Sequence, residues 1–162
     1  SFQNNILENL QHNANLADIL SNSLMPNHFH FCLKQNIENG ISEMLRRISD
    51  SYTKYFNLKY DRVGSLFQGR FKAVLIESDE QLLHVVRYID LNSYSSGIIK
   101  RIEDLENYEW SSFRQYIHGS NGICDTRMIL SLFKSREEYK QFVFDQADYQ
   151  KELENIKHLI LE

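Results

Sequence analysis

The chain has 162 residues, 42% of them hydrophobic and 25% charged, and a formal net charge of −4. This composition is typical of a soluble globular domain, and no apolar run approaches the roughly 18 residues that a membrane span needs. Two cysteines far apart in the sequence, Cys32 and Cys124, argue against a disulfide framework or a zinc ribbon. We therefore expect a cytoplasmic protein with no membrane contact.

The first predicted elements are a helix over 2–13 and a strand over 15–25 that turns at Pro26-Asn27. Residues 28–33 then alternate His or Cys with Phe or Leu, which predicts the second strand of a hairpin. Because strand side chains alternate between faces, His28 and His30 project to one side and Phe29 points toward the core. Two such imidazoles can share a cation, and imidazole alone favours zinc. Strand histidines without a ligand are the alternative.

Apolar residues three to four positions apart predict an amphipathic helix over 41–58, with Arg46, Arg47 and Lys54 off its apolar stripe. Residues 44–72 carry seven basic and two acidic side chains, so positive charge is concentrated in one part of an acidic chain. Tyrosine and phenylalanine residues are interleaved with these charges. The mixture suits phosphates and stacked bases. A solvated charged face is the alternative interpretation.

A loop over 61–65 and a strand over 66–76 are expected next. Ser78 then begins a capping box with acidic residues in the first turn, which starts a helix that runs to Asn92. His84, Tyr88 and Asn92 are spaced by four residues and share one polar stripe beside the apolar one. Tyr88 could reach the histidine strand from this rigid helix, or it could pack at the edge of the core with its hydroxyl in water.

A closing helical segment is expected around residues 108–117, followed by a shift to small polar residues near Gly119. Two further helices are predicted, one over 126–133 and one from Ser135, which starts another capping box. This organisation predicts a main domain over 1–119 and a helical C-terminal extension over 120–162. The extension carries no chemistry of its own, so packing or partner binding is its expected role.

Four stretches, in this order, resemble the HUH single-tyrosine transposases of bacterial insertion sequences, particularly the REP-associated tyrosine transposases. They are Met25-Pro26-Asn27-His28-Phe29-His30, Gly64 to Lys72 (Gly-Ser-Leu-Phe-Gln-Gly-Arg-Phe-Lys), Ser78 to Asn92, and Trp110-Ser111-Ser112-Phe113. The resemblance covers about residues 2–118. Any one of these stretches would be weak support, but all four together are specific.

The resemblance implies a ferredoxin-like α+β fold, with an antiparallel sheet and helices on one face, and a metal-dependent DNA transposase. Such an enzyme cleaves and rejoins single-stranded DNA at hairpin-flanked sites through a 5′-phosphotyrosine. By matching position, Tyr88 is the nucleophile and His28, His30 and Asn92 are ligands of Mg²⁺ or Mn²⁺, which replaces the zinc expected from imidazole alone. Single-stranded or hairpin DNA is the expected partner, and a homodimer is allowed. The site of action is the bacterial cytoplasm, at the nucleoid when DNA is bound.

Basic side chains of the segment 44–72 are the expected phosphate contacts, with the ring of Phe67 or Tyr60 stacked on an unpaired base. The residues assigned to DNA binding in this way are Arg46, Arg47, Arg62, Phe67, Arg70 and Lys72.

The chain differs from the family pattern at two places. The family usually has a further strand before its first helix, so the main domain is expected to lack that strand. Ser93-Tyr94-Ser95-Ser96-Gly97 also stands where proline and a basic residue are common. Three alternatives to the transposase therefore stay open: a replication-initiator or relaxase nickase, a catalytically inactive or domesticated hairpin-DNA-binding module, and a structural metal protein. If Tyr88 is not the nucleophile, Tyr94 is the next candidate.

Overall fold

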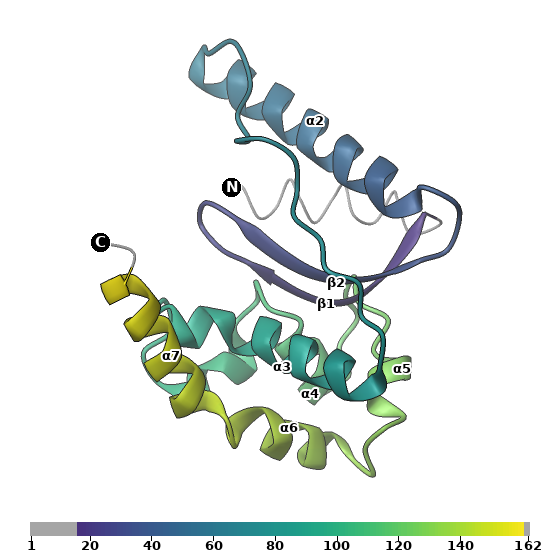
Figure 1. Ribbon diagram of the computed structural model, residues 1–162, viewed down its shortest axis with the longest axis vertical. Coiled ribbons are helices and arrows are strands. Elements are labelled where there is room, and N and C mark those ends of the chain that lie inside the picture. The colour runs from purple at the N-terminus through teal and green to yellow at the C-terminus, as the bar shows by residue number, and fades with distance from the viewer. Residues whose placement is uncertain (1–15, 161–162) are drawn as a thin grey trace. The chain divides into compact units, whose positions relative to one another are not determined.

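A computed structural model of the chain describes residues 16–160. The elements in chain order are β1 (Ala17–Leu24), β2 (Phe29–Gln35), α2 (Gly40–Tyr60), α3 (Asp79–Ser95), the 3₁₀ helix η1 (Ile102–Asn107), α4 (Phe113–His118), α5 (Arg127–Leu130), α6 (Arg136–Phe144) and α7 (Ala147–Ile160). Figure 1 labels the strands and α-helices on the ribbon. The fold is α+β, as predicted. The helix expected over 2–13 lies outside the described residues.

The chain divides into two compact units. Among the described residues, 16–18 and 33–76 form the first unit, and 19–32 and 77–160 form the second. Residues on both sides of position 119 belong to the second unit, and the domain boundary predicted there stays a prediction.

Strands β1 and β2 form the predicted antiparallel hairpin, and the described sheet has these two strands. The turn at Pro26-Asn27 is closed by a 2.9 Å hydrogen bond from the backbone N–H of Met25 to the carbonyl oxygen of His28. The outer edge of β1 is paired at two isolated points. Ser23 forms an antiparallel bridge with Ser111, and Ile19 forms a parallel bridge with Cys124.

The first unit is built on α2, which extends the predicted helix by one or two residues at each end. Met44, Ile48 and Tyr52 are buried along one face, as the spacing predicts. Gly40 begins the helix because a Cβ there would lie 2.1 Å from the carbonyl oxygen of Leu16, so only glycine fits.

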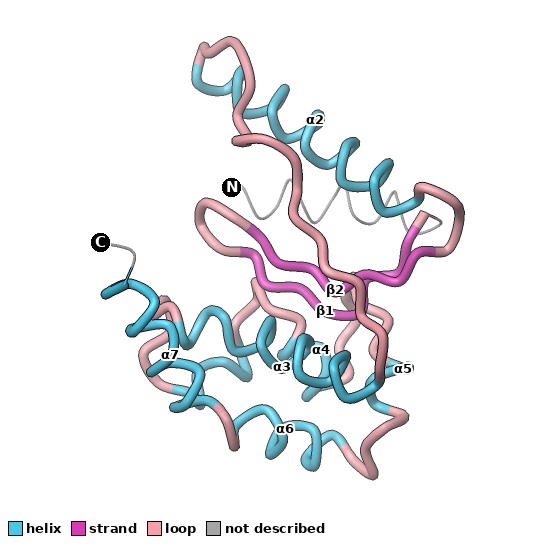
Figure 2. The backbone as a smooth tube through the Cα atoms, in the orientation of Figure 1, coloured by secondary structure: helices cyan, strands magenta, loops and turns pink. Residues whose placement is uncertain are grey.

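The strand predicted over 66–76 is wrong. Figure 2 draws residues 61–76 as a continuous loop, and no helix or strand is assigned there. Three of the apolar side chains responsible for the prediction are exposed, at 48% for Phe71, 82% for Val74 and 78% for Leu75. A strand needs a neighbouring strand for its backbone N–H and C=O groups, and the sheet that the described residues form contains only β1 and β2. The larger sheet expected of a ferredoxin-like fold is likewise reduced to the β1–β2 hairpin among the described residues.

The second unit packs helices around α3, and α7 lies along α3 (Figure 1). Helix α3 begins as predicted, with the Ser78 hydroxyl accepting a 3.2 Å hydrogen bond from the backbone N–H of Gln81. The predicted helix over 126–133 is shorter in the structure, and the helix predicted from Ser135 is interrupted between α6 and α7. Buried aromatic rings join α4 to α6, with Tyr116 and Tyr139 stacked at 4.7 Å between centroids.

None of the helices described here combines the length and apolar content required to cross a membrane.

Candidate metal and tyrosine site

His28 and His30 lie side by side at the start of β2. Their ring centroids are 5.1 Å apart and the ring planes are nearly perpendicular, at 89°. His28 is exposed at the end of the turn and His30 is half-buried in the strand. The alternation predicted from the sequence therefore does place both imidazoles together.

The predicted core side of this strand needs a correction. Cys32, on the histidine face, is the buried residue at 2% exposure, whereas Phe29 and Phe31 on the opposite face are only partly buried. The two phenylalanine rings contact each other at 4.9 Å between centroids. The histidine face thus runs directly from solvent at His28 into the interior at Cys32.

The His28 ring is oriented by its neighbour in the turn. Its Nδ1 lies 2.7 Å from the side-chain oxygen of Asn27. An amide oxygen only accepts hydrogen bonds, so this contact suits the tautomer with the proton on Nδ1, in which Nε2 carries the lone pair. A hydrogen bond from the second ring nitrogen to an oxygen acceptor is the usual support for a metal-binding imidazole.

Tyr88 lies next to the histidine pair. Its ring centroid is 6.1 Å from that of His30, and the two rings meet edge to face at 89°. Tyr88 is half-buried on the middle of α3. His28, His30 and Tyr88 all belong to the second unit, so a single chain brings the three side chains together.

Asn92 follows Tyr88 by one helical turn and is 6% exposed. Its backbone carbonyl accepts hydrogen bonds from the N–H of Ser96 at 3.0 Å and from the hydroxyl of Ser95 at 3.2 Å. Among the described residues, no group of three His, Cys, Asp or Glu side chains could hold a metal ion. The role of Asn92 as a third ligand beside the histidine pair stays a prediction.

Tyr94, the other tyrosine considered as a nucleophile, is inside the protein. Its ring is 7% exposed, its hydroxyl donates a 3.1 Å hydrogen bond to Asp148, and the Lys151 ammonium lies 4.3 Å from the ring centroid. Burial raises the pKa of the Tyr94 hydroxyl, which further opposes its use as a nucleophile.

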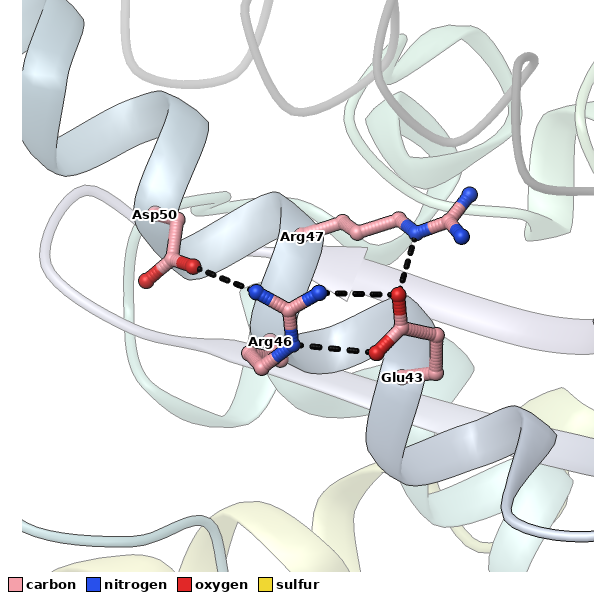
Figure 3. Close-up of polar contacts among 4 residues, drawn as sticks. All are labelled: Glu43, Arg46, Arg47 and Asp50. Carbon is pink, nitrogen blue, oxygen red and sulfur yellow. Dashed lines mark hydrogen bonds and ion pairs between the residues drawn. The ribbon is translucent and has the colours of Figure 1, made fainter.

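Two of the predicted phosphate contacts are held by acidic neighbours on α2. Figure 3 shows Arg46 bonded to Glu43 through two nitrogens, at 2.8 and 3.0 Å, and to Asp50 at 3.0 Å. Arg47 donates its Nε–H to the same Glu43 carboxylate at 2.6 Å. These hydrogen bonds from the two arginines lower the pKa of Glu43 to about 2. Arg46 and Arg47 therefore carry compensated charges.

The remaining residues assigned to DNA binding lie at the end of α2 and in the loop that follows it. The Arg62 guanidinium lies 5.6 Å from the centroid of the Phe56 ring, and Phe67 contacts Tyr52 at 6.1 Å between centroids. Arg70 and Lys72 are exposed, and neither has an ion-pair or hydrogen-bond partner within the described part of the chain. These residues and α2 belong to the first unit, whereas the histidines and Tyr88 belong to the second.

Sequence reasoning missed Asp90, which lies on α3 between Tyr88 and Asn92 and is fully buried. Burial raises the pKa of this carboxyl to about 6, against the lowering effect of hydrogen bonds from Ser112, Tyr139 and Ser21. A signal was present in the spacing. Asp90 continues the apolar series of Leu82 and Val86 at intervals of four residues, which places it on the buried stripe.

A family model described as "Transposase IS200 like" matches residues 2–92, which is more than half of the chain. The matched region includes the histidine pair, α2 and the Tyr88 helix, and it ends before the Trp110 to Phe113 stretch. No curated protein and no solved structure matches the chain. The chain belongs to the family of IS200-like transposases.

Proposed function

We propose that this transposase cleaves and rejoins single-stranded DNA through Tyr88, with Mg²⁺ or Mn²⁺ held by His28 and His30. One observation carries the proposal: a single chain places the Tyr88 ring 6.1 Å from His30, which in turn lies 5.1 Å from His28. A DNA-cleaving enzyme needs a nucleophile beside its charge-stabilising group, and this arrangement supplies both.

The residues present fit a divalent cation. Two nearly perpendicular imidazoles at this separation can direct one nitrogen each to a common ion about 2 Å away. In the tautomer that donates Nδ1–H to Asn27, Nε2 of His28 would offer its lone pair to the ion. Asn92 would add an amide oxygen, and the positions left open suit water or a phosphate oxygen of the DNA. When bound, the cation would polarise the scissile phosphate and neutralise charge that develops on its oxygens.

Tyr88 would act as the nucleophile. A phenol with a pKa near 10 is mostly protonated at neutral pH, so it must lose its proton as it attacks. The phenolic oxygen forms a bond to phosphorus while the bond from phosphorus to the 3′ oxygen breaks, which leaves a 5′-phosphotyrosine and a free 3′-OH. Rejoining reverses this exchange with a 3′-OH of another strand, so no external energy source is required.

DNA would be bound by the first unit as well. Arg62, Arg70 and Lys72 would contact phosphates, and the ring of Phe67 would stack on an unpaired base next to a hairpin. Arg46 and Arg47 would contribute less to DNA affinity than two uncompensated arginines, because Glu43 and Asp50 neutralise their charge. The enzyme would act on bacterial DNA in the cytoplasm.

The competing function is a hairpin-DNA-binding module that has lost catalysis. It is favoured by the segment Ser93 to Gly97, which lacks the proline and the basic residue common in the family. That module would use the same basic and aromatic side chains without turnover at Tyr88.

The two functions are separated by incubating the protein with 5′- and 3′-labelled hairpin oligonucleotides and Mn²⁺. If the protein is a transposase, it forms an adduct that survives denaturing electrophoresis and is lost in Tyr88→Phe. The control is Tyr94→Phe, which removes a buried tyrosine hydroxyl from the same helix and should retain the adduct. DNA binding without any adduct supports the module. An adduct that survives Tyr88→Phe contradicts the proposed nucleophile.

A further inference from the structure

The Asp90 carboxylate gathers three hydroxyl groups from separate parts of the second unit. Its Oδ1 accepts hydrogen bonds from Ser112 at 2.6 Å and from Ser21 at 3.1 Å. Its Oδ2 accepts a 2.5 Å hydrogen bond from the Tyr139 hydroxyl. Ser21 lies on β1, Ser112 directly precedes α4, and Tyr139 lies on α6. Asp90 thus joins α3 to three neighbouring segments at one point.

Burial of a carboxylate at this position has a high desolvation free energy. Asp90 is 0% exposed and continues the buried stripe of Leu82 and Val86, where an apolar side chain would pack without losing its hydration. Three hydroxyl donors offset part of that cost. A buried polar cluster can fix one register between the elements that it joins, because its hydrogen bonds form in only one arrangement. Apolar packing does not impose a single register in this way.

The elements that Asp90 holds in register, α3 and the β1–β2 hairpin, are the ones that carry the candidate site. Tyr88 lies two residues before Asp90 on α3, and Ser21 lies on the strand that the Pro26-Asn27 turn connects to His28 and His30. The Ser21–Asp90 hydrogen bond therefore ties the tyrosine helix directly to the histidine hairpin. A slide of α3 along β1 would break this bond and would move Tyr88 relative to His30.

Ser112 strengthens the same connection from a third side. Its hydroxyl lies 3.0 Å from that of Ser21 and accepts a 3.0 Å hydrogen bond from the backbone N–H of Asn22. The backbone N–H of Ser112 donates to the carbonyl of Asn22 at 2.9 Å, next to the Ser23–Ser111 bridge. The Trp110 to Phe113 stretch thus adds a second connection between β1 and α3, through Ser112.

We propose that Asp90 is a positioning residue, which holds Tyr88 at its working distance from the histidine pair through Ser21, Ser112 and Tyr139. Its effect on DNA cleavage rests on the proposed function, whereas its effect on the distance between Tyr88 and His30 does not. Through Tyr139, the C-terminal helices become part of the support of the candidate site.

The test compares Tyr139→Phe with Tyr116→Phe. Both tyrosines are 0% exposed, their rings stack on each other, and each variant removes a single buried hydroxyl without changing the ring. The Tyr139 hydroxyl donates to Asp90, whereas the Tyr116 hydroxyl donates to the backbone carbonyl of Leu20 at 2.5 Å. A general loss of stability should affect both variants, and a loss of register should affect only the first. Asp90→Ala removes the whole cluster.

The first readout is the NMR cross-peak between the ring protons of His30 and Tyr88 in the protein without DNA. The second is the rate of adduct formation on a hairpin oligonucleotide with Mn²⁺, at saturating and at low DNA concentration. We expect Tyr139→Phe and Asp90→Ala to weaken the cross-peak and to lower the saturating rate by roughly tenfold or more, with the half-saturating DNA concentration unchanged. Tyr116→Phe should show a similar fall in Tm with the cross-peak and the rate retained.

Equal effects in the two tyrosine variants would overturn the positioning role, as would a normal cross-peak in Asp90→Ala. If the wild-type protein forms no adduct but the cross-peak still responds to Tyr139→Phe alone, then the proposed cleavage fails and the positioning role stands.

Discussion

The side chain of Gln150 donates a 3.0 Å hydrogen bond to the backbone carbonyl oxygen of Tyr88. The same nitrogen lies 3.3 Å from the hydroxyl oxygen of Ser95, and Gln150 is 9% exposed. Helix α7 therefore contacts α3 at the backbone of the candidate nucleophile itself.

Replacing Gln150 by leucine should lower both stability and the rate of adduct formation. The variant removes one hydrogen bond to the Tyr88 carbonyl and one to Ser95, which should reduce the free energy of unfolding by about 1–2 kcal/mol. Chemical denaturation and single-turnover adduct assays measure the two effects. Tyr149→Ser, at the exposed neighbouring position, is the control and should change neither. A normal rate in Gln150→Leu would show that α7 packs on α3 without supporting Tyr88.

Removal of either histidine should abolish binding of Mn²⁺. Two imidazoles form the core of the proposed site, so His28→Ala and His30→Ala should each leave too few ligands for tight binding. Titration calorimetry or the Mn²⁺ electron paramagnetic resonance signal measures this directly. Asn27→Ala should weaken binding by roughly 10- to 100-fold, because His28 loses the acceptor that orients its ring. His84→Ala, an exposed histidine on α3, should bind as the wild type does, and loss of binding there would contradict the assignment.

Glu43→Gln should increase the affinity for single-stranded DNA. The substitution removes the carboxylate that Arg46 and Arg47 share and leaves Asp50 as the acidic neighbour of Arg46, so both guanidinium groups should contact phosphates more strongly. Each additional phosphate contact should steepen the dependence of log affinity on log salt by about 0.7. Fluorescence anisotropy over a series of salt concentrations gives both quantities. Glu38→Gln changes the net charge equally at an exposed position of the same unit, so an equal gain there would show a non-specific charge effect.

The same glutamate predicts a pH dependence of stability. Its pKa is lowered from 4.5 to about 2 in the folded protein by hydrogen bonds from Arg46 and Arg47. A carboxyl with a lowered pKa stabilises the fold fully above its ordinary pKa of 4.5, and this contribution is lost as the pH falls toward 2. The Tm difference between the wild type and Glu43→Gln should therefore be constant from pH 5 to 8 and shrink between about pH 4.5 and 2. A difference that grows on acidification would contradict the ion-pair assignment.

The sequence predicts those parts of the fold that local patterns determine. Alternation gives the hairpin and the common face of His28 and His30, and the Ser78 capping box gives the start of α3. The strand over 66–76 failed because a strand is stabilised by its neighbours, and residue pattern alone does not supply one. The role predicted for Tyr88 came from the family resemblance, since a tyrosine on a helix flank has no distinctive local pattern.

The Asp90 cluster depends on long-range contacts. Asp90 meets Ser21, Ser112 and Tyr139, which are separated from it by 69, 22 and 49 residues. An aspartate in a helix otherwise indicates a solvated side chain, and only its place on the apolar stripe suggested burial. Glu43 was overlooked for a different reason: it lies one residue outside the basic segment, although a helix brings it to Arg46 and Arg47.

The two bridges on the outer edge of β1 can form only late in the synthesis of the chain. Ser111 and Cys124, which pair with this edge, are synthesised 88 and 105 residues after their partners Ser23 and Ile19. Until then the backbone groups of β1 are available to pair with another nascent chain. Chains that stop before Cys124 should therefore be recovered mainly in inclusion bodies, and chaperone demand should be highest before residue 124 has been translated.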